Sequence, residues 1–127
     1  MGGALSTFGE SYGSDGQPIV EVFEYATTGI RMDDLNRSLA IPIPDFIKMD
    51  VDGIEHLILS GGEEVLSAVK GVLIEVNDGF EEQATQCAAL LSESGLILCD
   101  KRQADMVASF GSSAQNTFLS DLGARVI

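Results

Sequence analysis

The chain has no tryptophan, one histidine, two cysteines and three prolines, and only seven lysine and arginine residues stand against twenty aspartate and glutamate residues. The formal net charge of −13 repels polyanions, because binding to phosphates depends on protein cations that displace counterions. This scarcity of cations argues against nucleic acid and anionic membranes as partners. The longest stretch without a charged residue, Met106 to Ser120, is too short and too polar for a bilayer span, so no transmembrane helix is expected.

The two cysteines, Cys87 and Cys99, lie in apolar surroundings without the spacing of metal ligands. This pattern predicts buried thiols in a reducing compartment rather than a disulfide framework. The first residues carry no basic cluster and are soon followed by Glu10 and Asp15, which argues against a secretory signal. The expected location is therefore cytoplasmic.

The length of 127 residues and the hydrophobic content of 45% fit one soluble domain. Residues 1–18 hold five of the fourteen glycines and show neither helical nor strand periodicity. They are expected to form a flexible, Gly/Ser-rich N-terminal segment. Residues 19–127 are expected to form the domain itself.

Strand-like and helix-like segments alternate along residues 19–127. β-Branched and apolar runs predict strands at Ile19–Tyr25, Phe46–Val51, Val72–Val76, Leu96–Cys99 and Thr117–Leu119. Helical periodicity predicts helices at Asp33–Leu39, at Ile54–Val69 with a break at Gly61–Gly62, and at Glu81–Ser94 with Gly95 as its left-handed cap. This alternation implies right-handed crossovers and an α/β fold with an open, mainly parallel sheet.

The same patterns assign side chains to the core and to helix ends. The almost continuous apolar runs Phe46–Val51 and Val72–Val76 are typical of strands buried on both faces. The acidic pair Asp33–Asp34 is expected to cap the helix that it opens. The inward positions of the two longer helices are expected to be Leu57, Ile58, Val65, Leu66 and Val69 in one, and Ala84, Cys87, Ala88 and Leu91 in the other.

Acidic residues follow two of the central strands. Asp50, Asp52, Glu55 and the single histidine, His56, follow the first of them, and the cluster Glu75–Asn77 ends the second. Because the ligand crevice of an open α/β sheet lies outside the carboxyl ends of its strands, both clusters are expected to line one rim. Such an acidic rim suits a cation, a hydroxyl-rich substrate or a metal.

Some of these residues also have a structural explanation. Asp52 and Glu55 can cap the following helix and complement its dipole. A lone histidine on an early helical turn, as at His56, is more often structural than catalytic. Asp50 is different, because a carboxylate at the end of a buried strand needs donors or a counter-charge. It is therefore the strongest functional candidate.

The tetrapeptide Asp50–Gly53, which reads DVDG after an apolar strand, resembles the nucleophile motif of haloacid-dehalogenase-type phosphatases. In that motif the first aspartate attacks phosphorus, the second moves a proton, and magnesium is required. The resemblance covers four residues, and Ile54 stands where those enzymes have threonine. A magnesium-dependent phosphatase that uses Asp50 and Asp52 is one alternative hypothesis, and a non-catalytic association module is another.

Four longer blocks, in order and with their spacing, resemble the FkbM family of S-adenosylmethionine-dependent methyltransferases: Met32–Leu35, Pro44–Glu55, Leu59–Gly62 and Val72–Asn77. The most specific part is IKMDVDGIE followed by LIEVN, and the resemblance covers roughly residues 19–100. It implies the doubly wound class I methyltransferase fold, a Rossmann-like three-layer sandwich. It also implies methyl transfer from S-adenosylmethionine to a hydroxyl group of a small molecule or sugar.

The resemblance also implies which part of the fold this chain represents. In the family, the glycine-rich loop for the methionine part of the cofactor and the acid for its ribose come from the first two strands, which precede the matched blocks. The expected fold is therefore an incomplete sandwich that lacks the first βα units and is not competent alone. The strand that carries Asp50 would expose an apolar edge, covered by a second copy of the chain, by an N-terminal half or by Ile19–Tyr25.

The resemblance and the place of the acidic clusters assign roles to six residues. Asp50 is expected to lie nearest to the reacting centre, and His56 is the second catalytic candidate because histidine is the residue type most often used as a general acid or base. The remaining assignments are Asp50 and Asp52 to the cofactor, and Glu55, Glu75 and Asn77 to the substrate. No residue is assigned to a metal.

Overall fold

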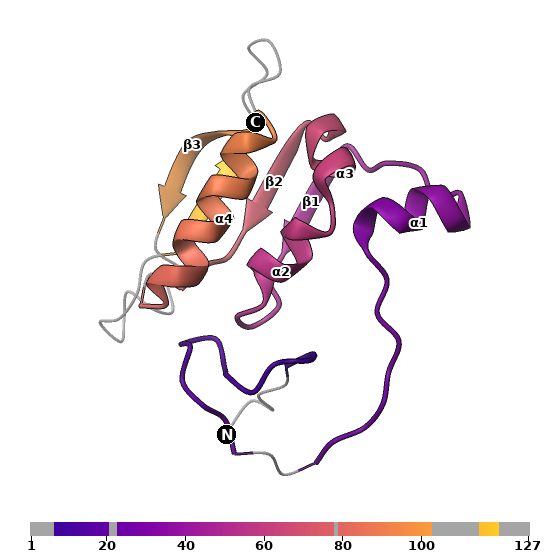
Figure 1. The fold of residues 1–127 in the computed structure, drawn as a ribbon. Helices are drawn as coiled ribbons and strands as arrows, with labels where there is room; N and C mark the ends of the chain where they lie inside the picture. Colours follow the sequence, from indigo (N-terminus) through magenta and orange to yellow (C-terminus); the bar gives the residue numbers. More distant parts are fainter. Residues whose placement is uncertain (1–6, 21–22, 78, 103–114, 120–127) are drawn as a thin grey trace.

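The computed structural model describes residues 7–20, 23–77, 79–102 and 115–119 (Figure 1). Its elements are α1 (Met32–Leu39), β1 (Phe46–Met49), α2 (Glu55–Ser60), α3 (Glu63–Ala68), β2 (Gly71–Ile74), α4 (Glu81–Glu93), β3 (Ile97–Arg102) and β4 (Gln115–Leu119). The helices and strands predicted between residues 33 and 99 are thus confirmed, with boundaries shifted by a few residues, and so is the last strand.

The four strands form one sheet in the order β1-β2-β4-β3. β1 and β2 pair in parallel, from Phe46 opposite Gly71 to Met49 opposite Ile74, whereas β4 is antiparallel to both of its neighbours. β1, β2 and β3 therefore share one direction, but among the described strands only β1 and β2 form a parallel pair. The apolar run Leu96–Cys99 predicts a third central strand, and this prediction is wrong for the described sheet, because β4 lies between β3 and β2.

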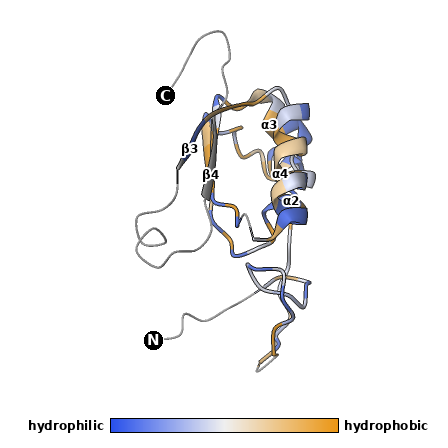
Figure 2. Ribbon diagram, turned by 90° about the vertical axis from the view of Figure 1, so that its left-hand side faces the viewer, coloured by the Kyte–Doolittle hydropathy of each residue, from blue (hydrophilic) through white to orange (hydrophobic). Residues whose placement is uncertain are grey.

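The core lies between the sheet and one layer of helices. Figure 2 shows α2, α3 and α4 on the same side of the sheet. The sheet and these helices both contribute to the core, which consists of the fully or almost fully buried side chains Met49, Leu59, Val65, Leu66, Val69, Val72, Ile74, Val76, Cys87, Leu91 and Leu96. The described residues form two layers, so the predicted third layer of the Rossmann-like sandwich is not seen in them.

The opposite face of the sheet is open in the described part of the chain. Phe46 is 49% exposed and Leu73 is 45% exposed, whereas their strand neighbours Met49 and Val72 are buried. The expectation that these strands are buried on both faces is therefore wrong for the described residues. Side chains alternate along a strand, so a continuous apolar run places half of its members on the face that lacks helices.

The helical region after β1 breaks at Gly61–Gly62, as predicted, and gives two short helices. Val65, Leu66 and Val69 are buried as expected, but Leu57 is 41% exposed and Leu59 takes its place in the core. The break explains the error. The inward positions were predicted for one continuous helical period, whereas α2 and α3 are separate helices that each present their own side chains to the core. α4 ends as predicted, with Gly95 in the left-handed conformation at φ +84°.

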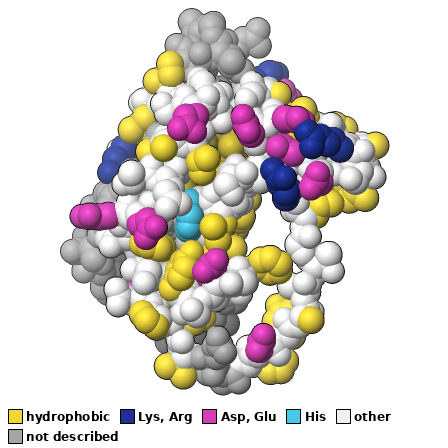
Figure 3. Space-filling view, in the orientation of Figure 1, with side chains coloured by type: hydrophobic (Ala, Val, Ile, Leu, Met, Phe, Trp, Pro, Cys, Tyr) yellow, Lys and Arg dark blue, Asp and Glu magenta, His cyan; other side chains and the backbone are white. Residues whose placement is uncertain are grey.

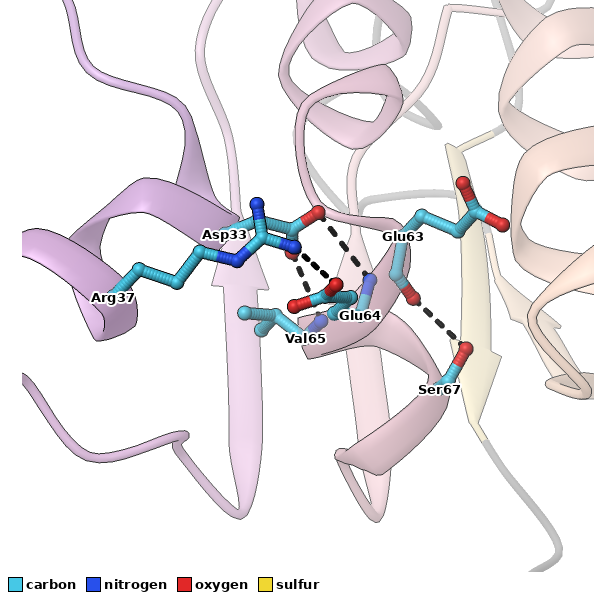
Figure 4. Close-up of polar contacts among 6 residues, drawn as sticks. All are labelled: Asp33, Arg37, Glu63, Glu64, Val65 and Ser67. Carbon is cyan, nitrogen blue, oxygen red and sulfur yellow. Dashed lines mark hydrogen bonds and ion pairs between the residues drawn. The ribbon is translucent and has the colours of Figure 1, made fainter.

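Asp33 caps a different helix from the one predicted (Figure 4). The N-cap of α1 is Arg31, without a side-chain hydrogen bond. Asp33 is 5% exposed and instead accepts hydrogen bonds from the backbone N–H groups of Glu64 at 3.4 Å and Val65 at 3.1 Å. It caps α3 from another helix, and Arg37 of α1 forms an ion pair with Glu64 beside it. These contacts fasten α1 to α3.

The segment Ile19–Tyr25 forms no strand in its described residues, so that prediction is wrong. Val20, Phe23 and Tyr25 are 88%, 82% and 71% exposed, and nothing in the described structure pairs with their backbone. β-Propensity alone does not make a strand without a partner. The segment therefore does not cover β1, which pairs only with β2 among the described strands.

The surface and the cysteines complete the description of the fold. Acidic side chains are spread over the helical face in Figure 3. Cys87 is buried and Cys99 is exposed, and neither of them forms a disulfide, so the prediction of two buried cysteines holds for Cys87 only. No helix in the described parts of the chain combines the length and the apolar character needed to cross a bilayer.

Candidate functional site

The parallel pairing of β1 and β2 brings the two acidic clusters together. Met49 lies opposite Ile74, and the backbone N–H of Glu75 donates to the carbonyl oxygen of Met49 at 3.0 Å. The next residues, Asp50 and Glu75, leave the sheet side by side, and both line the same pocket. The rim predicted from the strand ends is therefore present.

A pocket of about 120 Å³ opens at this rim. It is lined by Ser14, Asp50, Asp52, Gly53, Glu55, Glu75, Val76, Asn77 and Gln83. Five of the six predicted site residues are in this lining, and the sixth, His56, is not. Carboxylate groups dominate the lining, so the pocket favours cations and groups that donate hydrogen bonds.

The turn after β1 presents the carboxylates because Glu55 holds its backbone. Asp52 at φ +59° and Gly53 at φ +111° give the chain the tight reversal that leads into α2. Glu55 is 3% exposed, and its carboxylate accepts from the N–H groups of Val51 and Gly53, each at 3.1 Å. It also accepts from the side-chain amide of Gln83. Both oxygens of Glu55 are thus engaged within the protein, and its predicted contact with substrate stays a prediction.

The carboxyl groups at the rim have different electrostatic surroundings. Lys48 Nζ lies 2.8 Å from Asp50 Oδ2, and this contact raises the pKa of Lys48 and keeps Asp50 paired with a cation. Burial raises the pKa of Glu75, and the neighbouring charge of Asp50 and their shared hydrogen bond add to the effect. Lys70 pairs with Asp45 at the opposite end of the two strands, at 2.7 Å. The pKa of Glu75 therefore lies above the ordinary range of a glutamate.

His56 lies outside the pocket. It is 7% exposed, its Nδ1 atom has no hydrogen-bond partner, and its ring meets the ring of Phe80 edge-on at a centroid distance of 6.2 Å. Its predicted catalytic role stays a prediction, and the geometry gives it no contact with the rim.

Four lining residues, Ser14, Gly53, Val76 and Gln83, were not predicted as site residues, and the side chains of two of them, Gln83 and Ser14, are polar. Gln83 is 1% exposed and joins the two strand ends, because it donates to Glu55 and its Oε1 accepts from the N–H of Asn77 at 3.3 Å. Its place one helical turn before the buried Cys87 was a signal for this inward position. Ser14 carries no such signal, because it belongs to the glycine-rich segment that has no periodicity.

No group of three or more His, Cys, Asp or Glu side chains within the described residues could hold a metal ion. Among the carboxylates of the rim, Asp50 pairs with Lys48, and Glu55 accepts from backbone N–H groups.

Comparison with protein families identifies the chain. The model of the Methyltransferase FkbM domain matches residues 3–104. The chain belongs to the FkbM methyltransferase family. The match begins before Ile19 and includes most of the glycine-rich N-terminal segment, which the resemblance in sequence had left out. The membership does not support the phosphatase alternative. No curated protein and no solved structure matches the chain.

Proposed function

We propose that the pocket at the ends of β1 and β2 is a methyl-transfer site, where a hydroxyl group of a small molecule or sugar receives the methyl group of S-adenosylmethionine. Membership of the FkbM family supports methyl transfer in general. The observation that carries the site assignment is the group of four carboxyl side chains, Asp50, Asp52, Glu55 and Glu75, that line one pocket at the ends of the two parallel strands.

The negative charge of the pocket suits the sulfonium cation of the cofactor, but the volume of the pocket is too small for the whole cofactor. A carboxylate close to the sulfonium cation stabilises it by up to about 4 kcal/mol in a moderately screened site. Sites for molecules of this size usually occupy roughly 300 to 1,000 Å³, whereas this pocket measures about 120 Å³. The described residues therefore fit one part of the cofactor, its sulfonium end.

Another stretch of polypeptide completes the site in this proposal. β1 has one paired edge among the described strands, and apolar Phe46 is exposed beside it. An N-terminal half of the domain, or a second copy of the chain, would pair with the open edge of β1 and bury this surface. We accordingly expect the chain by itself to bind the cofactor weakly and to self-associate, and a monodisperse monomer in light scattering would contradict the second expectation.

The chain's own residues then have distinct tasks. When bound, S-adenosylmethionine supplies a methyl group on a sulfonium cation, which passes to the acceptor oxygen as the thioether leaves. Asp50, held by Lys48, faces the cation, and Asp52 accepts hydrogen bonds from hydroxyl groups. Glu75 accepts the proton that the acceptor hydroxyl loses, because its raised pKa makes it a stronger base than an ordinary glutamate. Positioning contributes most of the acceleration.

Location of the bound cofactor tests this proposal. S-adenosylmethionine is added at millimolar concentration to the isotope-labelled chain, and backbone amide signals are followed by NMR. We expect shifts at Gly53, Glu75 and Asn77, and their loss in Asp50→Asn. Asp45→Asn is the matched control, because Asp45 pairs with a lysine at the other end of the same strands. Shifts elsewhere, or none, would overturn the site assignment.

The free thiol of Cys87 and the exposed thiol of Cys99 are compatible with a reducing compartment, and cytoplasmic location remains part of the proposal.

A further inference from the structure

The glycine-rich segment near the N-terminus forms an ordered turn, here called the N-terminal turn, residues 12–17. The N–H of Gly13 donates to Gln17 O and the N–H of Gly16 donates to Gly13 O, both at 2.9 Å. Gln17 N also donates to Asp15 Oδ1 at 3.0 Å. Tyr12 and Pro18 form an isolated bridge at its base. The indigo segment beneath the sheet in Figure 1 contains this turn.

Asn77 fastens the N-terminal turn to the end of β2. Its Nδ2 atom donates to the carbonyl oxygen of Ser14 at 3.1 Å, across 63 positions of the sequence. Its Oδ1 atom accepts from the N–H of Gly79 at 2.9 Å. Both ends of the Asn77 amide are thus engaged within the protein, which favours a positioning task over the direct contact with substrate predicted from the sequence.

Close packing holds the same turn from two other sides. A Cβ atom on Gly53 would lie 2.9 Å from Gly13 O and 2.9 Å from the Cα atom of Ser14, so the two loops touch backbone to backbone. A Cβ atom on Gly16 would lie 2.8 Å from the ring of Phe80. Tyr12 meets that ring edge-on at a centroid distance of 5.5 Å. The turn is therefore seated on the ends of both β1 and β2.

We propose that the N-terminal turn is a wall of the methyl-transfer site, with Ser14 as a ligand-contacting residue and Asn77 as the positioning residue that holds it. Ser14 lines the pocket together with the carboxylates. Ionised carboxylates only accept hydrogen bonds, whereas a serine hydroxyl also donates one. Ser14 thus orients the oxygen of a hydroxyl-bearing acceptor. The nature of this ligand rests on the proposed function, but the wall itself does not.

Hydrogen exchange of the full chain tests the positioning role. Asn77→Asp keeps the acceptor for Gly79 and loses the donor to Ser14, and Asn77→Ala removes the donor without adding charge. Asn36→Asp is the matched control, because Asn36 Nδ2 donates to Ile41 O at 3.0 Å on an exposed helix away from the pocket. We expect the amides of Gly13 and Gly16 to exchange about fivefold faster or more in both Asn77 variants, the factor for one hydrogen bond. Unchanged exchange would overturn the role.

A pH titration tests whether Ser14 faces the carboxylates. The amide signal of Ser14, followed by NMR, is expected to move with the ionisation of Glu75 in the wild type and in Asn36→Asp. This movement is expected to vanish in Glu75→Gln and in Asn77→Ala. The proposal would be overturned if the Ser14 amide signal did not change with the ionisation of Glu75 in the wild type. It would also be overturned if the signal still changed with that ionisation in Asn77→Ala.

Neither measurement needs the cofactor, so failure of the proposed function can be distinguished from failure of the proposal that the N-terminal turn is a wall of the site. If S-adenosylmethionine leaves the pocket signals unchanged while Ser14 follows Glu75, the proposed function fails and the wall stands. If the cofactor shifts Gly53 and Glu75 but Ser14 ignores both cofactor and pH, the wall fails and the proposed function stands.

Discussion

Replacement of Glu55 by alanine is expected to be the most damaging single change near the site. Glu55 is 3% exposed, and its two oxygens accept from Val51 N, Gly53 N and the Gln83 side chain. The substitution leaves two backbone N–H groups of the turn and one buried amide without their acceptor. The turn that presents Asp50 and Asp52 would lose its support from α2.

The size of the effect follows from these orphaned donors. Each buried donor left without a partner costs about 1–3 kcal/mol, and removal of one member of a buried charged network costs about 3–5 kcal/mol in total. The whole domain is stabilised by roughly 5–15 kcal/mol, so Glu55→Ala removes a large share of its stability. Glu55→Gln keeps one acceptor and turns an NH₂ group toward a donor, so an intermediate loss is expected.

Urea unfolding followed by circular dichroism measures these differences. Glu82→Ala is the control, because Glu82 lies on the same helix as Gln83 and its bond to Gln86 at 3.2 Å is exposed. A surface change of this kind is expected to stay within about 0.5 kcal/mol of the wild type. If Glu55→Ala were as harmless as Glu82→Ala, the account of the turn would be refuted.

Three further predictions concern other parts of the molecule. The pKa of Glu75 is raised in the folded state, so the stability that this residue contributes is present below the ordinary glutamate pKa and is lost as pH rises through the raised value. Glu75→Gln should therefore melt higher than the wild type at neutral pH, and a lower melting temperature would count against the raised pKa of Glu75. Asp33→Ala should cost about 1–2 kcal/mol in urea unfolding through loss of the α3 cap, whereas the same change at its neighbour Asp34 should cost little. Burial raises the pKa of the Cys87 thiol to about 12, so a thiol reagent should label Cys99 quickly and Cys87 only on unfolding; equal rates would contradict the buried position.

Much of the fold follows from local signals in the sequence. The period of the apolar residues and the glycines at 61, 62 and 95 place α2, α3 and α4, because these signals act within one or two helical turns. The meeting of Asp50 with Glu75 follows from a general property of parallel strands, whose carboxyl ends share an edge. These predictions needed no knowledge of distant contacts.

Several of the features that were missed depend on contacts between residues far apart in the sequence, or on the lack of such contacts. β4 inserts between β2 and β3 through pairing across many residues, which a short apolar run does not specify. Asp33 caps a helix 31 positions away, although its sequence context is that of a local cap. Ile19–Tyr25 has the composition of a strand, but none of its described residues belongs to the sheet.

The N-terminal turn is the clearest example of this limit. Its glycines predict a loop, and the structure indeed has one, but the loop is anchored to Asn77, Gly53 and Phe80. Glycine allows close backbone approach, and only the partner at the other end shows what is approached. Ser14 enters the pocket lining for this reason and not through any motif.

The central claim is that Asp50 faces the sulfonium cation of the cofactor. The most direct test compares the affinity of the chain for a ligand with a positively charged sulfur and for a ligand with a neutral sulfur. Dissociation constants of S-adenosylmethionine and of S-adenosylhomocysteine, its uncharged thioether product, are measured by NMR titration for the wild type, Asp50→Asn and Asp45→Asn. The account predicts a preference of about tenfold for the sulfonium in the wild type and Asp45→Asn, lost in Asp50→Asn. Equal affinities in the wild type, or a preference that survives in Asp50→Asn, would contradict it.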